Sequence, residues 1–285
     1  PKTAHIIVGT KELADLMTRR GFPAVTLVEP RLDRLPPPSA TDTAAFAARH
    51  DLDSDLARVV VASRLASFKM DGLRLAIDAV EMVEATLPVQ LVIVGEGSGE
   101  GELRARAERV NARLDRRAVV FTGVVRNVAA AYAAADLVLG MGTAVLGGMA
   151  QGKPAVVIGE KGFSALLTDE TATALSEVGF FGEGSPDDPA TRLAGHIAEA
   201  LHDPRRTAEL AACSLDVVRR RPTKDQTEAK VELVYREAIG ATHGPAERGL
   251  HAGRSLGRFV AMRARGRLAR RVTRARGPHG QGDVA

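Results

Sequence analysis

The sequence contains no tryptophan and a single cysteine, Cys213, among its 285 residues. One cysteine excludes a disulfide framework within the chain, and such sparse use of cysteine is typical of a reducing compartment. Its apolar helical context favours a buried side chain over a nucleophile. The chain has no apolar run near the roughly 20 residues that span a bilayer, and no secretory signal at its start. We therefore expect a cytoplasmic protein.

Aromatic residues are scarce, with two tyrosines and eight phenylalanines, and charge is unevenly distributed. Residues 244–285 contain ten arginines against Glu247 and Asp283, whereas the preceding residues contain 29 basic and 33 acidic side chains. An acidic body with few rings for base stacking argues against nucleic acid as a partner. The net charge of +4 therefore arises from the C-terminal segment.

This basic segment, residues 244–285, has two interpretations. Within residues 250–276, apolar side chains recur every four positions among the arginines, which is typical of a helix lying on an anionic membrane surface. Four glycines between 249 and 266 favour a disordered tail instead. Both interpretations remain open, and the first predicts a peripheral protein on the cytoplasmic face of a membrane.

Runs of aliphatic and β-branched residues alternate with amphipathic stretches after residue 57. Such strands, separated by helical crossovers, predict a parallel sheet covered on both faces, a doubly wound α/β fold. Strands are expected at 58–62, 89–94, 118–121, 136–139 and 154–158, and helices between them at 71–86, 100–114, 127–135 and 143–151. Three more helices are expected at 189–202, 204–219 and 224–239.

The residues before this pattern are organised differently. Strands are expected at 4–8 and 24–28 with a helix ending at Gly21 between them, which is too little to enclose a core. Three consecutive prolines at 36–38 exclude both a helix and a central strand. We therefore interpret residues 35–57 as a linker that includes a short helix.

Cations and glycines follow the strands of the predicted sheet, at the edge where open parallel sheets bind ligands. Ser63, Arg64 and Lys69 follow the first of these strands. A guanidinium can engage two phosphate oxygens while an ammonium adds a point charge, so Arg64 and Lys69 suit a pyrophosphate. The other strand ends are rich in glycine, which lets a ligand approach the backbone closely. The residues concerned are Gly95, Gly97, Gly123, Gly140, Gly142 and Thr143.

Two glycine-rich segments are similar to nucleotide-binding loops without matching them. A dinucleotide fingerprint needs a third glycine where Glu100 and Val145 stand, and the lysine pattern of a P-loop is also missing. We therefore expect no nicotinamide, flavin or other cofactor, and no metal. The helix beginning at Thr143 instead offers free backbone N–H groups that can bind phosphate. A glycine turn packed against the next strand is the alternative interpretation of this segment.

Four segments between residues 59 and 160 match the order and spacing of one set of enzyme motifs. SRLASFK is similar to Gly-Arg-Leu-x-x-x-Lys, with Arg64 and Lys69 at the two cationic positions. LVIVGEGSGEGEL and VVFTGVV are similar to Val-x-Gly-x-Gly and Phe-x-Gly-x-Val. ADLVLGMGTAVLGGMAQGKPAVV is similar to a stretch ending in Leu-Glu-Ala-Met-Ala-x-Gly-x-Pro-Val-Val. Together these motifs resemble those of the retaining glycosyltransferases of family 4.

By this resemblance the complete enzyme has the GT-B fold, two Rossmann-like domains with the active site between them. The implied reaction moves a hexose, with retention, from a UDP- or GDP-sugar to an unknown glycan, lipid or small-molecule acceptor. Arg64 and Lys69 are implied as the catalytic residues, because they bind the diphosphate and stabilise the departing nucleoside diphosphate. The implied donor-binding residues are Ser63, Gly95, Gly97, Gly123, Val124, Val125, Gly142, Thr143, Ala144, Val145 and Gly147.

The resemblance also divides the chain. Residues 1–34 correspond to the end of the N-terminal acceptor domain, 35–57 to the linker, and 58–223 to the donor-binding domain. Residues 224–243 correspond to a helix that crosses back to the first domain, and 244–285 to the basic tail. On this division most of the acceptor half is missing, so we expect a truncated enzyme that does not turn over efficiently alone.

The sequence departs from the family pattern at two acids. The family carries two glutamates eight positions apart, and the second commonly contacts the ribose of the donor. Gly147 occupies that second position, and the segment before it is too short for the first. Weaker ribose binding or an altered donor preference follows. A non-catalytic nucleotide-sugar-binding domain or subunit is therefore the alternative function, and the failed fingerprints disfavour an NAD-dependent oxidoreductase.

Overall fold

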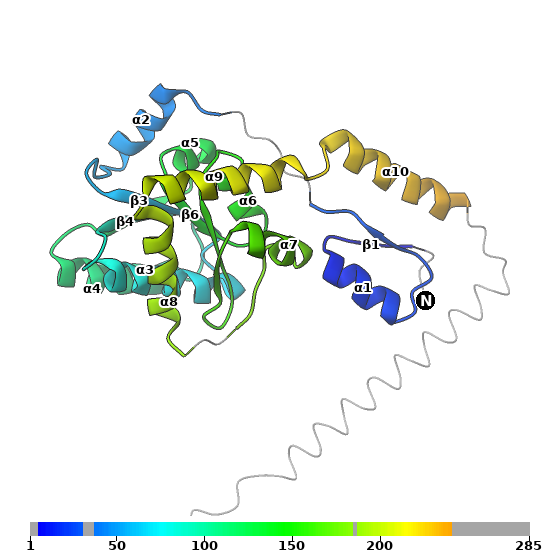
Figure 1. Cartoon of the computed structure of the whole chain (residues 1–285), viewed down its shortest axis with the longest axis horizontal. Coiled ribbons are helices and arrows are strands. Elements are labelled where there is room, and N and C mark those ends of the chain that lie inside the picture. Colours follow the sequence, from blue (N-terminus) through cyan, green and yellow to red (C-terminus); the bar gives the residue numbers. More distant parts are fainter. Residues whose placement is uncertain (1–4, 31–36, 185–186, 241–285) are drawn as a thin grey trace, which may run out of the picture.

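The computed structural model describes residues 5–30, 37–184 and 187–240 (Figure 1). The predicted tail at 244–285, with its membrane-contact segment at 250–276, lies outside the described residues. Residues 1–4, 31–36, 185–186 and 241–243 lie outside them as well. The larger part of the molecule is built around a six-stranded sheet, and a smaller part contains a two-stranded sheet.

The larger sheet is mostly parallel. Its strands are β3 (Ala57–Ala62), β4 (Val89–Val94), β5 (Val119–Gly123), β6 (Leu137–Gly140), β7 (Ala155–Ile158) and β8 (Ser164–Leu166). Their order is β5-β4-β3-β6-β7-β8, and every neighbouring pair is parallel except β7 with β8. The strand order reverses between β3 and β6, so the predicted doubly wound α/β sheet is confirmed.

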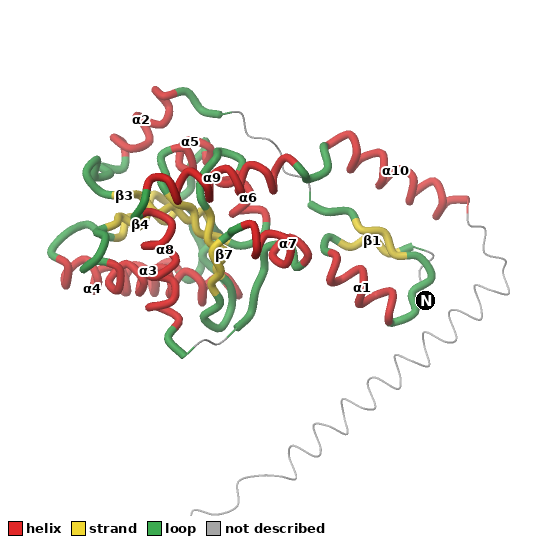
Figure 2. The backbone as a smooth tube through the Cα atoms, in the orientation of Figure 1, coloured by secondary structure: helices red, strands yellow, loops and turns green. Residues whose placement is uncertain are grey.

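Helices cover both faces of this sheet (Figure 2). Because successive side chains of a strand point to opposite faces, Val59 and Val61 of β3 join one core cluster and Val60 the other. The first cluster is completed by α3 (Met70–Val83), α4 (Glu100–Leu114) and α8 (Pro189–Leu201). The second is completed by α2 (Ala40–Arg49), α5 (Val128–Ala133), α6 (Thr143–Met149), α7 (Asp169–Glu177) and α9 (Pro204–Arg219).

The helices after the sheet begin where the sequence predicts. Asp188 and Asp203 cap α8 and α9, and each is followed by proline at the first helical position. An aspartate oxygen accepts from a free N–H of the first turn, and proline has no N–H to leave unpaired there. The last described helix is α10 (Lys224–Gly240). None of the described helices is long and apolar enough to cross a membrane.

The smaller part consists of β1 (Ile6–Val8), α1 (Lys11–Arg19) and β2 (Val25–Leu27), with β1 and β2 parallel. It is joined to the rest by polar contacts from several elements. His5 lies 3.0 Å from Glu237 of α10, and Lys11 lies 3.2 Å from Glu177 of α7. Arg221, 8% exposed, lies 3.7 Å from Glu29. The structure therefore describes a βαβ unit beside the larger part (Figure 1).

Two elements were not anticipated from the sequence. Strand β8 runs antiparallel at the sheet edge, with Val156 opposite Leu166 and Ile158 opposite Ser164. Helix α7 follows it, capped by Thr168, whose side chain accepts from the N–H of Thr171. This antiparallel edge strand is an addition to the parallel strands that the sequence predicts. The β8 segment, Ser-Ala-Leu, contains one large apolar residue, so its sequence pattern does not indicate a strand.

Candidate functional site

A small cavity opens at the reversal of strand order, at the carboxyl ends of β3 and β6. Its volume is about 180 Å³, and its floor is formed by buried side chains such as Val61, Leu73 and Ile158. The exposed residues at its rim are Arg64, Thr143 and Phe181. The other lining residues are Ala62, Ser63, Lys69, Gly140, Met141 and Ala144. The structure thus brings together five predicted site residues: Ser63, Arg64, Lys69, Thr143 and Ala144.

The two predicted catalytic cations lie on the segment that leaves β3. Ser67 adopts a left-handed conformation with φ of 53°, and a 3₁₀ turn, η1 (Ser67–Lys69), leads into α3. Serine rarely adopts this conformation, and strained residues of this kind cluster at functional sites. Within the described part of the chain, Arg64 and Lys69 make no ion pair with an acid. Both cations are therefore available to an anionic ligand.

Lys69 is held in an unusual environment for an ammonium. The side chain is half-buried, and its Nζ lies 4.9 Å from the ring centroid of Phe68 and 5.2 Å from that of Phe181. Burial, and then the nearby charge of Arg64, lower the pKa of Lys69 to about 8. A bound phosphate would relieve both effects, because it supplies the missing opposite charge. A perturbed lysine inside a cavity is typical of a binding or catalytic site.

The segment that follows β6 reaches the cavity through only part of its length. Gly142 has φ of 63°, and its N–H donates to the carbonyl of Phe180 at 2.8 Å. Thr143 and Ala144 then line the cavity, whereas Val145 is fully buried against Gly140. Helix α6 is seven residues long. Val145 and Gly142 are thus not among the lining residues, although both were predicted to bind the donor.

Gly147 faces a buried tyrosine. A Cβ at this position would lie 2.7 Å from Cε2 of Tyr132 on α5. The Tyr132 hydroxyl donates to the carbonyl of Ala144 at 2.7 Å, and burial raises the pKa of this tyrosine to about 12. Tyr132 therefore occupies the space into which a longer side chain at 147 would extend. The aromatic ring thus fills the volume beside the position where the family pattern has a glutamate.

Gly95 and Gly97 pack against backbone. A Cβ on Gly95 would lie 2.0 Å from the carbonyl oxygen of Ser63, and one on Gly97 would lie 2.4 Å from that of Leu65. The two segments are also joined by hydrogen bonds, since Leu65 N–H donates to Glu96 and Gly99 N–H donates to Leu65. Neither glycine lines the cavity. Because these positions are glycines, the two backbone segments can approach closely, and this holds the segment that carries Arg64 in place. Glycine is therefore explained here by packing, without any contact with a ligand.

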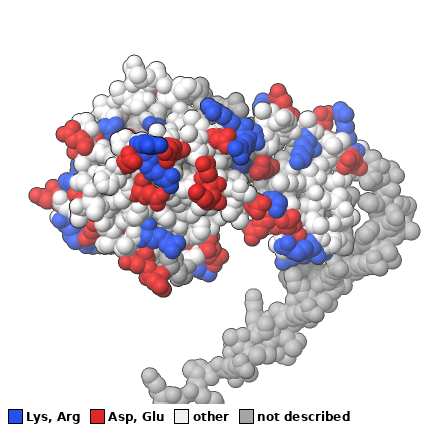
Figure 3. Space-filling model, in the orientation of Figure 1, with Lys and Arg blue, Asp and Glu red and all other residues white. Residues whose placement is uncertain are grey.

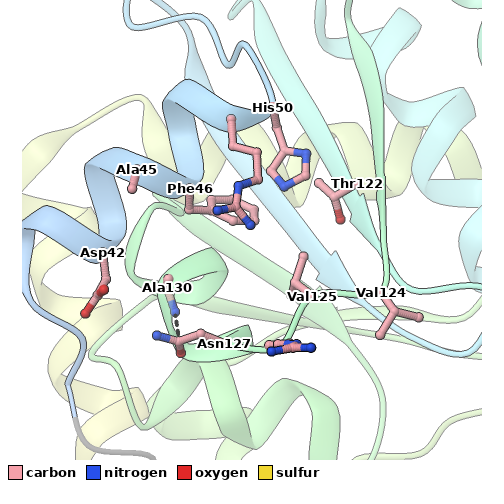
Figure 4. Close-up of a pocket in the computed structure, with 11 residues that line it drawn as sticks. Asp42, Ala45, Phe46, His50, Thr122, Val124, Val125, Asn127 and Ala130 are labelled. Atoms are coloured by element: carbon pink, nitrogen blue, oxygen red, sulfur yellow. Dashed lines mark hydrogen bonds between the residues drawn. The ribbon is translucent and has the colours of Figure 1, made fainter.

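A second, larger cavity of about 450 Å³ lies between α2 and the loop that follows β5, which carries the predicted donor-binding residues Val124 and Val125 (Figure 4). Thr122, Val124 and Val125 lie across this cavity from Phe46 of α2 and from His50, which follows α2. Val124 is 65% exposed, so it is free to contact a ligand. Gly123 has φ of 67° and accepts at its carbonyl from the N–H of Gly95. Of the predicted donor-binding residues, Ser63, Thr143 and Ala144 therefore line the smaller cavity, Val124 and Val125 line the larger one, and the others line neither.

Sequence reasoning overlooked two aromatic residues of this region. Phe181 lines the smaller cavity and Phe68 also lies beside Lys69, with 6.5 Å between the two ring centroids. Both rings are exposed, at 42% for Phe181 and 48% for Phe68. Two exposed rings beside a cation are notable in a chain with only eight phenylalanines. The VGFFG segment, with adjacent phenylalanines between glycines, was the available signal.

Comparison with known proteins identifies this architecture. The model of the family described as "Glycosyl transferases group 1" matches residues 57–203, just over half of the chain. This range contains both cavities apart from the contributions of α2. Among curated proteins, none matches the chain.

Solved GT-B glycosyltransferases share the fold. A glycosyltransferase from Rickettsia africae is 14% identical with a TM-score of 0.64, over 85% of this chain and 65% of that one. HepE from Anabaena, solved with UDP and glucose, is 18% identical with a TM-score of 0.63, over 82% of this chain and 63% of that one. The chain thus spans just under two thirds of these proteins. On the family match, this chain belongs to the group 1 glycosyl transferases.

Proposed function

We propose that the larger part of this chain binds a nucleoside diphosphate sugar, with the diphosphate at the cavity between β3 and β6. The observation that carries the proposal is the pair of cations, Arg64 and Lys69, that face this cavity without an acidic partner among the described residues. The position supports it further, because ligands of open parallel sheets bind where the strand order reverses. Arg64 can hold two phosphate oxygens, and Lys69 neutralises a third.

The same residues would act in catalysis by stabilising charge. When the bond between the sugar and the diphosphate breaks, negative charge grows on the leaving phosphate oxygen. Arg64 and Lys69 lie where they meet that charge, and Thr143 at the rim offers a hydroxyl donor. We propose transfer of a hexose with retention, in the manner of family 4, to a glycan, lipid or small-molecule acceptor.

The nucleoside is proposed to extend toward Val124 and Val125. A cavity of about 180 Å³ is smaller than the roughly 300–1,000 Å³ of most small-molecule sites, so it holds only part of a nucleotide sugar. The loop that leaves β5 borders the larger cavity and exposes Val124. HepE was solved with UDP-glucose, which favours UDP-glucose as the first donor to test. Gly123, Val124 and Val125 would then contact the base.

A second candidate function is nucleotide-sugar binding without transfer. The observation that favours it is Tyr132, which fills the space beside Gly147 where the family pattern places an acid. Binding with no transfer to any acceptor would support this alternative.

We further propose that residues 224–243 act as the crossing helix and that residues 1–34 end an acceptor domain. Membrane contact by residues 250–276 is tested by liposome flotation of the chain with and without residues 245–285.

Calorimetry on the full chain tests the proposal. UDP and GDP are each titrated, with UMP and GMP as controls that lack the second phosphate. We expect one diphosphate to bind about tenfold or more tightly than its monophosphate, because a second phosphate adds charge-assisted hydrogen bonds. Binding of neither diphosphate, or equal binding of monophosphate and diphosphate, would refute the assignment of the cations to the diphosphate. Hydrolysis or transfer with UDP-glucose then separates the two candidate functions.

A further inference from the structure

Phe181 differs from the other apolar residues that line the smaller cavity. Val61, Leu73, Met141 and Ile158 are 5% exposed or less and belong to the floor, whereas Phe181 is 42% exposed and belongs to the rim. Its ring lies over Gly142, where a Cβ would be 2.7 Å from Cζ of Phe181. The rim thus presents a guanidinium, a hydroxyl and one aromatic ring to a ligand.

The backbone before Phe181 is strained into position. Gly179 has φ of 70° and Phe180 has φ of 59°, so two consecutive residues are left-handed. A bulky residue in this conformation is a clear outlier, and such strain persists only where surrounding contacts enforce it. Phe180 is fully buried, its carbonyl accepts from Gly142, and the Arg221 guanidinium lies 5.8 Å from its ring centroid. The buried Phe180 therefore anchors the turn that directs Phe181 to the rim.

Phe68 provides an internal comparison for Phe181. Both rings are exposed to a similar degree and both lie about equally far from the Lys69 ammonium, at 4.9 Å for Phe68 and 5.2 Å for Phe181. Only Phe181 of the two lines the cavity among the described residues. If a ring affects ligand binding through its contact with Lys69, substitution of either phenylalanine shows that effect. If a ring contacts the ligand in the cavity directly, only substitution of Phe181 shows the effect.

We propose that Phe181 is the wall against which the transferred sugar packs, and that it is a specificity-determining residue for the donor. The cationic part of the cavity takes the diphosphate, so the sugar attached to it lies toward the remaining rim, where Phe181 stands over Gly142. A pyranose ring has apolar C–H faces, and ligand sites commonly pair such faces with aromatic side chains and fix the orientation with a few polar groups. This inference rests on the proposed donor site.

The experiment measures a ratio of affinities. UDP and UDP-glucose, and in parallel GDP and GDP-mannose, are titrated into the full chain, its Phe181→Ala variant and its Phe68→Ala variant. For Phe181→Ala we expect UDP to bind within about twofold of the parent, and UDP-glucose to weaken about fivefold relative to UDP. For Phe68→Ala we expect the ratio of the two affinities to stay the same, because any loss through Lys69 affects both ligands.

Each outcome has a separate meaning. An unchanged or increased preference for UDP-glucose over UDP in Phe181→Ala overturns the inference while leaving the donor site intact. Absence of binding by UDP and GDP to the parent chain overturns the donor site, and the inference with it. If Phe181→Ala unfolds at a lower temperature than the parent, Phe181→Leu replaces it, since leucine retains an apolar side chain without a ring face. A ratio that falls in Phe181→Leu supports the inference.

Discussion

Four arginines that lie on α3 or α4 or shortly after α4 are paired with acids, whereas the two cations after β3 are not. Arg106 lies 2.6 Å from Asp78, Arg113 lies 2.5 Å from Glu81, Arg116 contacts Glu84, and Arg74 lies 2.5 Å from Glu102. Acidic and basic side chains are also interspersed over the face seen in Figure 3. Arg64 and Lys69 have no such partner among the described residues.

We propose that the difference separates charges that pair within the protein from charges that are kept for a ligand. Paired side chains on exposed helices neutralise each other locally, and each pair contributes little to stability. An unpaired cation costs more as it is buried, because burial removes water from the charge. Lys69 is half-buried with a lowered pKa, so the fold tolerates an unfavourable charge at one place. A ligand that brings negative charge is the simplest reason for keeping it there.

Placing an acidic side chain on α6 tests the contrast between paired and unpaired cations and should have the largest effect. Gly147→Glu forces a side chain against Tyr132, where even Cβ would lie 2.7 Å from the ring. We expect the free energy of unfolding to fall by about 3 kcal/mol or more, from overpacking and from a buried carboxylate. Chemical denaturation measures it.

Gly195→Glu is the matched control, because nothing lies within 4 Å of a Cβ at that exposed helical glycine. Tyr132→Ala combined with Gly147→Glu should recover part of the lost stability. If Gly147→Glu folds as stably as the parent and raises the pKa of Lys69, an acid can pair with the cations from α6. The distinction between paired and unpaired cations would then be accidental.

Removing the unpaired guanidinium tests the other side of the comparison. Arg64→Ala should weaken binding of the preferred nucleoside diphosphate by about 10- to 100-fold, because a bidentate charged contact is lost. Calorimetry measures the change. Arg109→Ala, on the exposed side of α4, removes the same charge away from the cavity and should bind like the parent. Equal losses in both variants would mean that only net charge matters.

The protonation of Lys69 gives the third effect. The ammonium of the free protein loses its proton as the pH rises through about 8. Diphosphate binding that needs this charge is constant below that pH and weakens above it, by up to about tenfold per pH unit. Titrations between about pH 7 and about pH 9.5 check the profile, and Lys69→Met should remove the dependence. A parent profile that is flat above pH 8 would exclude the ammonium from binding.

Breaking a paired arginine should have the smallest effect. Arg106→Ala removes a contact with Asp78 that is about two thirds buried on both sides. We expect the free energy of unfolding to fall by about 1 kcal/mol or less, with diphosphate affinity unchanged. Thermal and chemical denaturation give the first quantity and calorimetry the second. A marked loss of affinity in this variant would place a paired arginine in the site.

The sheet could be predicted from the sequence because its parallel strands are uninterrupted aliphatic runs. Arg64 and Lys69 could be predicted as diphosphate-binding residues because both follow a strand of that sheet. No strand or helix could be predicted within residues 159–188, because β8 and α7 are formed through contacts with residues distant in the chain. Glycine composition was also ambiguous. Gly95 and Gly97 face backbone, and Gly147 faces Tyr132, which no local pattern reveals. Phe181 escaped notice because its position depends on a left-handed turn.

The contact between Gly147 and Tyr132 also limits how this sequence can change. An acid at 147 cannot be gained first, because the ring stands in its way. If the Tyr132 ring is lost first, the hydrogen bond to Ala144 is lost with it and a cavity remains beside α6. The two positions are thus locked together, and descendants of this protein should change both or neither. Sequences that combine an acid at 147 with a small residue at 132 would mark the path by which the two arrangements exchanged.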